Sequence, residues 1–166
     1  PDTMIIKGSF EKCKIKELKI DDSQIWNIDC NQINTLNISY YKNNKNHFDL
    51  RKLSFLKKLT FDPLIELIES HFQNDYIRIE EVKIPSTVKT IGDNAFQHFC
   101  LIKEFVIPFS VTKIGDYAFG YCSRLMKIII PSSVTSIGKC CFISCYSLTH
   151  IEVPDSISKF ESGTFN

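Results

Sequence analysis

Prolines recur at a fixed interval in the second half of this chain, and this interval limits the fold more than any other feature. Pro85, Pro108, Pro131 and Pro154 are each separated by 23 residues. Three apolar columns keep the same interval, namely Val88, Val111, Val134 and Ile157; Ile91, Ile114, Ile137 and Phe160; and Phe96, Phe119, Phe142 and Phe165. Self-similarity at such a period is typical of a solenoid, in which each repeat forms one coil stacked on the next.

A shorter pattern extends the repeat into the first half of the chain, where the prolines are absent. Each copy is a frame of six residues, apolar-x-x-apolar-x-apolar, that predicts a short parallel strand with alternate side chains facing inward. The copies are Ile33/Leu36/Ile38, Leu56/Leu59/Phe61, Ile79/Val82/Ile84, Ile102/Phe105/Ile107, Leu125/Ile128/Ile130 and Leu148/Ile151/Val153, preceded by Ile15/Leu18/Ile20. We therefore expect about seven coils.

The rest of each proline-started coil predicts how the coil closes. Proline lacks a backbone donor and ends the strand, and the following "SVTKIG" or "SVTSIG" predicts a second short extended piece. The stretch "DYAFGYC" has the length of one helical or 3₁₀ turn on the opposite side. Upstream, Asp62 and Pro63 precede apolar residues at helical spacing, which predicts a true helix over 62–72.

We expect one solenoid over residues 1–166, with divergent coils over 13–84 and proline-started coils over 85–166. The last coil is incomplete after Phe165. Since solenoids need a polar cap, we expect the parent chain to continue there, or another chain to pack on this uncapped C-terminal coil.

The segment "IPSSVTSIGKCCFISCYSLTHI" (130–151) resembles the BspA-type leucine-rich repeat, and the resemblance extends over 79–165. Over 14–78 only the strand frame persists, which resembles leucine-rich repeats in general. The resemblance implies an α/β leucine-rich-repeat solenoid that binds through its surface, with no catalytic residues and no cofactor. Such domains occur in surface and secreted proteins of bacteria and parasitic protists, which favours a cell-surface or extracellular location; an intracellular one stays open.

Cysteines near the C-terminus raise the question of a metal site, because Cys140, Cys141 and Cys145 lie close in sequence to His150. The repeat argues against one. A single column contains Cys30, Leu53, Tyr76, Phe99, Cys122 and Cys145. A column that accepts large apolar residues is a core column, and paired Cys-x-x-Cys ligands are absent. We predict no metal, and a structural core that includes Phe96, Phe119, Phe142, Cys122 and Cys145.

Thiol chemistry stays open at two kinds of position. Cys122 and Cys145 would stack as neighbours at a separation close to disulfide range, so a bridge between them is one alternative. Cys140 aligns with Asn94 and Tyr117 and should face outward, and with Cys13 and Cys100 it is a candidate reactive thiol.

Composition and motifs exclude several classes of function. Twenty basic and nineteen acidic residues give a net charge of +1, so nucleic acid is not an expected partner. No apolar run is long enough for direct membrane insertion. The four histidines fall at unrelated phases of the repeat, and glycines come singly, so neither a catalytic motif nor a phosphate loop is indicated.

Outward positions of the strands are free to vary and form the candidate binding surface. Most are polar or charged, as in Lys57, Lys103 and Thr149 of one column. The exceptions are Val106, Phe109, Met126 and Ile129, which should lie on adjacent coils in one patch. Local cover of the sheet by Phe109 is the alternative explanation.

Two functions are compatible with these features. The first is a non-enzymatic binding or adhesion module whose strand face takes a protein or glycan ligand. The second is a structural or scaffold subunit of a larger intracellular assembly.

Overall fold

The computed structural model describes residues 17–21, 34–40, 55–69, 77–157 and 160–165. Every regular element in this part of the chain is a short β-strand. The strands are β1 (Glu17–Asp21), β2 (Thr35–Tyr40), β3 (Lys58–Phe61), β4 (Leu67–Ile68), β5 (Glu81–Lys83), β6 (Thr90–Ile91), β7 (Glu104–Val106), β8 (Lys113–Ile114), β9 (Lys127–Ile129), β10 (Ser136–Ile137) and β11 (His150–Glu152).

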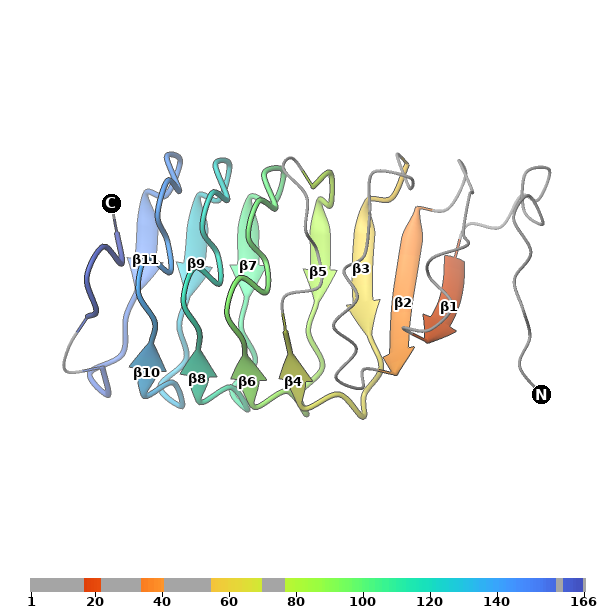
Figure 1. The fold of residues 1–166 in the computed structure, drawn as a ribbon, viewed down its shortest axis with the longest axis horizontal. Helices are drawn as coiled ribbons and strands as arrows, with labels where there is room; N and C mark the ends of the chain where they lie inside the picture. The colour runs from red at the N-terminus through yellow and green to blue at the C-terminus, as the bar shows by residue number, and fades with distance from the viewer. Residues whose placement is uncertain (1–16, 22–33, 41–54, 70–76, 158–159, 166) are drawn as a thin grey trace.

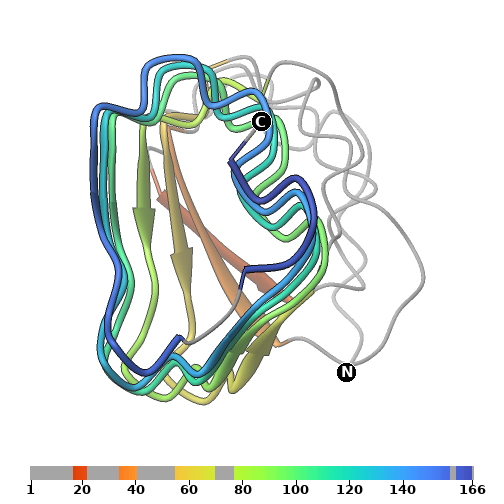
Figure 2. The same cartoon turned by 90° about the vertical axis from the view of Figure 1, so that its left-hand side faces the viewer.

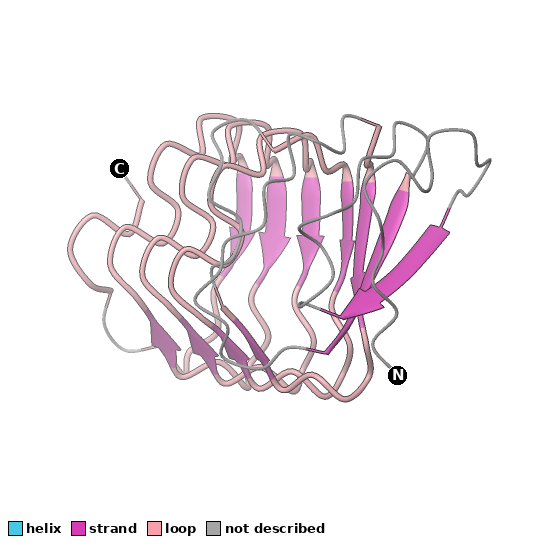
Figure 3. Ribbon diagram, turned by 45° about the vertical axis from the view of Figure 1, so that its right-hand side comes forward, coloured by secondary structure: helices cyan, strands magenta, loops and turns pink. Residues whose placement is uncertain are grey.

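These strands form parallel sheets on two sides of a solenoid. One side carries the sheets β1-β2-β3-β5 and β7-β9-β11, and another carries β4-β6-β8-β10. Figure 1 shows the first set of strands in a row along the long axis of the molecule, and Figure 3 shows the same row turned toward the reader. A strand occurs at every position that the apolar frame predicts, and the second extended piece predicted after Pro85, Pro108 and Pro131 is β6, β8 and β10, respectively. The parallel solenoid predicted from the repeat is thus confirmed.

Apolar columns stack along the interior. In Figure 2, which looks along the long axis, successive coils superimpose around this interior. The rings of Phe96, Phe119 and Phe142 are buried, and the centroid of each lies 5.6 Å from that of the next coil. Phe165 stacks on Phe142 at the same distance and is partly exposed. Val111, which lies between β7 and β8, and Ile114 on β8 are fully buried as well. Because each coil buries its apolar edge only against its neighbours, the continuous column stabilises all of them together.

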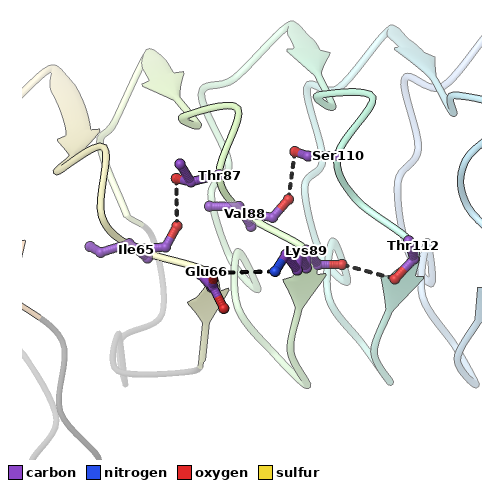
Figure 4. A network of polar contacts seen from close by, with 7 residues as sticks. All are labelled: Ile65, Glu66, Thr87, Val88, Lys89, Ser110 and Thr112. Atoms are coloured by element: carbon purple, nitrogen blue, oxygen red, sulfur yellow. Dashed lines mark hydrogen bonds and ion pairs between the residues drawn. The ribbon is translucent and has the colours of Figure 1, made fainter.

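Small hydroxyl side chains tie each coil to the one before it. Ser110 Oγ donates to the carbonyl of Val88 at 2.6 Å, and Thr87 Oγ1 donates to Ile65 O at 2.8 Å (Figure 4). Ser133 and Ser156 make the same bond at the next two steps. These bonds satisfy backbone carbonyls where the chain turns and the strand ladder has stopped, which explains why a hydroxyl residue recurs two positions after each proline.

The side opposite the strands consists of turns, and here the predicted helical turn is wrong. Asn94, Tyr117 and Cys140 all have positive φ, near 55°, as do His98, Tyr121 and Ser144 four residues later in each coil. Backbone amides on this side donate to the following coil, as Asn94 N does to Asp116 O and Phe96 N to Ala118 O. A helix would need these groups for bonds within its own segment, so inter-coil pairing takes its place.

The helix predicted over 62–72 is also wrong for its described part, residues 62–69. Leu67 and Ile68 form β4 and pair with β6 instead. The carbonyls of Glu66 and Ile68 accept from Lys89 and Gly92 in the next coil. Asp62 does cap a turn, since its carboxylate accepts from Leu64 N at 3.0 Å. The local helical signal is therefore overridden by the sheet that the neighbouring coil offers.

Candidate binding face

The outer side of the strands, here called the strand face, carries the side chains that the repeat leaves free. On β7 and β9 the central residue is buried and its neighbours are exposed. Val106 and Ile129 are register partners on these two strands. Val106 is 78% exposed and Ile129 41%. Two apolar side chains thus stand side by side in water, on the face that a strand normally fills with polar residues.

Two further residues extend this pair into what we call the apolar patch: Val106, Phe109, Met126 and Ile129. Phe109 follows Pro108 at the end of β7 and is 78% exposed. Met126 precedes β9 and is 42% exposed, and its backbone amide donates to Lys103 O at 2.7 Å. Because most of the Phe109 side chain is in solvent, the structure does not use it as a cover over the sheet.

The strand face over β3 and β5 has a different chemistry. Lys57 and Glu80 form an ion pair at 3.1 Å, and so do Lys58 and Glu81. Lys83 lies 3.7 Å from the same Glu81 carboxylate. Each of the two short pairs joins residues that are one repeat apart, so the charges of adjacent coils neutralise one another.

This neutralisation stops at β7. Among the described residues, Lys103, Glu104, Arg124 and Lys127 form no ion pair, even though Glu104 and Lys127 are register partners. Several of these side chains line a hollow of about 570 Å³ at the start of the strands, bordered by Glu80, Leu101, Lys103, Glu104, Arg124 and Met126. The hollow therefore adjoins the apolar patch through Met126.

A break in the strand ladder lies beside this hollow. In other coils two successive amides donate to one carbonyl of the preceding coil, as Met126 N and Lys127 N do to Lys103 O. Across the junction of β5 and β7, here called the seam, no described hydrogen bond joins the amides of Lys103 or Glu104 to Glu80 O. Figure 1 shows β5 and β7 as neighbours in the row, although they belong to different sheets.

The charge column changes at the seam. The repeat sets Glu81 opposite Glu104, and like charges directly opposite each other oppose strand pairing. The coils stay joined on another side, where β6 pairs with β8. The strand face is therefore interrupted while the solenoid is continuous.

The cysteine column lies inside the molecule. Phe99 and Cys122 are buried and Cys145 is half-buried, while Cys30, Leu53 and Tyr76 lie outside the described residues. Burial raises the pKa of the Cys122 thiol well above its usual range, and raises that of Cys145 to about 11. Each thiol donates to a carbonyl of the preceding coil, Phe96 O for Cys122 and Phe119 O for Cys145. Both thiols are free.

The other cysteines occupy two environments. Cys141 is buried, which raises its pKa, whereas Cys100 and Cys140 are partly exposed on the turns. Cys140 hydrogen-bonds the side chain of Tyr117, and this bond is the main cause of a raised Tyr117 pKa. Cys13 lies outside the described residues.

Residues that could suggest a metal or catalytic site are not brought together. His150 points along β11 and lies 3.0 Å from Glu152, on the strand face, while Cys141 is in the interior. His98 stacks on Tyr121 at 4.7 Å on the turn side. Within the described ranges, no three His, Cys, Asp or Glu side chains group so that they could hold a metal ion. The same residues include no helix of the length and apolarity that a membrane span requires.

Sequence reasoning missed the seam and the hollow. The columns Lys57–Glu80 and Lys58–Glu81 could have indicated inter-coil ion pairs, because opposite charges stand one repeat apart. At the next step of the second column, Glu81 is followed by Glu104, so two like charges replace the pair of opposite charges.

Known proteins with similar sequences or structures identify the family of this chain. The family model described as the BspA-type leucine-rich repeat region, in six copies, matches residues 3–100 and 89–166. A leucine-rich repeat protein from Bacteroides ovatus is similar in structure, with a TM-score of 0.65 and 26% identity over 90% of this chain. No curated protein matches the chain significantly.

Two further solved structures share the fold. A leucine-rich repeat protein from T. pallidum has a TM-score of 0.56 and 17% identity over 89% of this chain. A leucine-rich cell surface protein from Faecalibacterium prausnitzii has a TM-score of 0.55 and 22% identity over 84%. This chain spans 40%, 57% and 32% of the lengths of the three proteins, respectively. The repeat, the parallel strands and the family match lead to one conclusion: the chain belongs to the BspA-type leucine-rich repeat family.

Proposed function

We propose that this chain is a non-catalytic protein-binding module that contacts its partner through the apolar patch. The observation that carries the proposal is the exposed pair Val106 and Ile129, set in register on β7 and β9. Fully burying an aliphatic or aromatic side chain is worth about 1.5–3 kcal/mol, so covering the patch would supply much of a binding energy.

The rest of the scaffold supports this assignment. The interior columns hold the backbone in place without help from the strand face, so patch residues can be exposed at little cost to folding. Apolar anchors ringed by polar side chains are the usual arrangement of binding hot spots. Leucine-rich repeat proteins generally act as binding or adhesion modules, and a protein ligand can supply the apolar side chains that would cover an exposed apolar patch better than a glycan can.

The test replaces each patch residue with one that this chain itself uses in the same column. Thr60 precedes Val106 and Ile129 in their column, Thr149 follows Met126, and Ser86 and Ser132 flank Phe109. The quadruple variant is therefore Val106→Thr, Phe109→Ser, Met126→Thr and Ile129→Thr, and the native backbone suits every change. A matched control, Leu64→Ser with Tyr146→Ser, removes two side chains that are 85% and 84% exposed on other parts of the surface.

Wild type and both variants are immobilised and exposed to proteins from the cells that make the chain. A retained protein is purified, and its affinity is measured by calorimetry. We expect the quadruple variant to bind about 100-fold more weakly, as the loss of two hot-spot contacts would cause, and the control to bind as wild type does. Equal affinity of wild type and a folded quadruple variant would refute the proposal.

A further inference from the structure

We infer that the apolar patch and the hollow beside it bind an acidic, apolar peptide segment of the partner protein, with a carboxylate in the hollow. This inference rests on the proposed function and names the chemistry of the ligand. It is carried by three features that meet at the start of β7 and β9: unpaired cations, unpaired backbone amides and exposed apolar side chains.

The first feature is a local excess of positive charge. Lys103 and Arg124 border the hollow, and Lys127 lies on the adjoining row of β9. None of the three has an ion-pair partner in the described part of the chain, whereas Lys57 and Lys58 on the neighbouring strand are both paired. The ligand is therefore expected to bring the anions that the strand face lacks at this point.

Two carboxylates border the same hollow and reduce its positive charge. Glu80 is neutralised by Lys57 at 3.1 Å. Glu104 has no ion pair, so it offsets one of the three cations. Two unbalanced positive charges are left, and they favour an anionic ligand over a cationic one.

The second feature is the pair of amides at the seam. In the other coils, the two amides at the equivalent positions point toward the preceding coil and donate to one of its carbonyls. By analogy, the amides of Lys103 and Glu104 point toward β5, across the seam. Here the carbonyl of Glu80 does not accept from them. A carboxylate accepts well from two adjacent backbone amides, and such charge-assisted bonds are stronger than neutral ones. Because Lys103 and Glu104 both line the hollow, their amides would lie near a carboxylate held there by the cationic side chains.

The third feature fixes the spacing in the ligand. Val106 is three residues beyond Lys103 on the same coil, so the apolar pair lies about 10 Å from the hollow along the strand direction. The ligand should therefore hold an acidic side chain about 10 Å from its apolar anchor. Met126 lines the hollow and belongs to the patch, so it joins the two subsites.

A display library of random peptides tests this inference on the full chain. Peptides enriched on wild type are counter-screened on the quadruple patch variant, and those that need the patch are sequenced. We expect them to combine apolar residues with Asp or Glu. One selected peptide is then labelled, and its affinity is measured by fluorescence anisotropy for wild type and for Lys103→Glu with Arg124→Glu.

The charge-reversed variant should bind this peptide at least about tenfold more weakly, the effect of losing a hydrogen bond to a charged group. Its matched control, Lys113→Glu with Lys139→Glu, changes net charge equally at exposed positions on other sides and should bind as wild type does. Both variants change exposed side chains, and circular dichroism checks that each is folded.

The outcomes separate the two proposals. The carboxylate subsite would be refuted if the patch-dependent peptides lack acidic residues, or if they bind the variant with reversed charges at Lys103 and Arg124 as tightly as wild type. Either result would leave the proposed function standing. A library without any patch-dependent peptide would count against the proposed function itself. A chain that dimerises in sedimentation through the patch, and stays monomeric in the quadruple variant, would assign this surface to a second copy and overturn the inference.

Discussion

The strand face over β3 and β5 covers the same kind of apolar interior as the strand face over β7 and β9, yet the two regions differ in surface chemistry. The first is covered by the pairs Lys57–Glu80 and Lys58–Glu81. The second exposes Val106 and Ile129 and leaves its charges unpaired. The repeat thus determines the backbone and the interior columns, while the outward columns vary freely. The chemistry of the strand face is therefore a local feature of a few coils.

The largest expected effect comes from the interior that both regions share. Phe119 stacks between Phe96 and Phe142 and also lies 4.8 Å from Phe105, directly behind the apolar patch. Phe119→Ala should lower the unfolding free energy by about 3–5 kcal/mol, because it opens a cavity in a continuous column. Urea denaturation measures this loss.

Phe109→Ala is the matched control for this change, since it removes the same ring from an exposed position. It should alter stability by less than about 0.5 kcal/mol. If the two variants lose similar amounts of stability, the interior column is not what holds the coils together, and the comparison between the two surfaces loses its common base.

A second interior prediction uses pH. The folded pKa of Cys145 is raised from 9.0 to about 11, chiefly by burial. A thiol whose pKa is raised on folding stabilises the fold fully below the unfolded pKa, and this contribution is lost as pH rises through the folded pKa. The stability advantage of wild type over Cys145→Ala should shrink by about 2 kcal/mol between pH 8 and pH 11.

The measurement is urea denaturation of both proteins under reducing conditions across this pH range. Using the difference between the two proteins removes the effects of other groups that titrate in the same window. A difference that stays constant from pH 8 to pH 11 would show that Cys145 does not lie in the protected interior column.

The glycine column gives a smaller effect that differs between coils. A Cβ on Gly115 would meet the Asp93 carboxylate and the backbone of Gly92 and Asp93, because Asp93 Oδ1 accepts from Asp116 N at 2.8 Å and lies across this position. A Cβ on Gly92 would only approach Ile68 O, at 3.0 Å. Gly115→Ala should therefore cost about 1–3 kcal/mol in thermal or urea unfolding, and Gly92→Ala less. The reverse order would contradict the packing described here.

Apolar periodicity predicts the solenoid correctly but not every element within a coil. The strands, the buried phenylalanine column and the outward position of Val106 and Ile129 follow from apolar periodicity alone, because one phase of the repeat fixes which side chains face inward. Local spacing predicts a helix over 62–72, but in its described part, residues 62–69, Leu67 and Ile68 pair with the next coil instead. Local propensity does not contain that competing partner.

The seam could be predicted only in part. The column that brings Glu81 opposite Glu104 is visible in the sequence. Whether the like charges break the ladder depends on which neighbours neutralise them, and Lys58 and Lys83 both turn toward Glu81. That choice among several nearby partners is a property of the folded surface. The hollow likewise depends on the three-dimensional arrangement of several side chains, which the repeat pattern does not contain.

The smallest expected effect tests the seam itself by making the second region resemble the first. Glu104→Lys would set opposite charges across the seam, as Lys58 and Glu81 are set between β3 and β5. Opposite charges directly across a strand pair contribute about 0.2–1 kcal/mol, but the new lysine also faces its register partner Lys127, so the net gain in stability should stay below about 0.5 kcal/mol. The amides of Lys103 and Glu104 would then pair with Glu80 O and exchange with deuterium more slowly. Glu104→Gln, which removes the repulsion without adding attraction, should give intermediate exchange rates. If exchange at position 103 is unchanged in the lysine variant, like charge is not the cause of the break, and the difference between the two faces would then have to originate in the packing beneath β5 and β7.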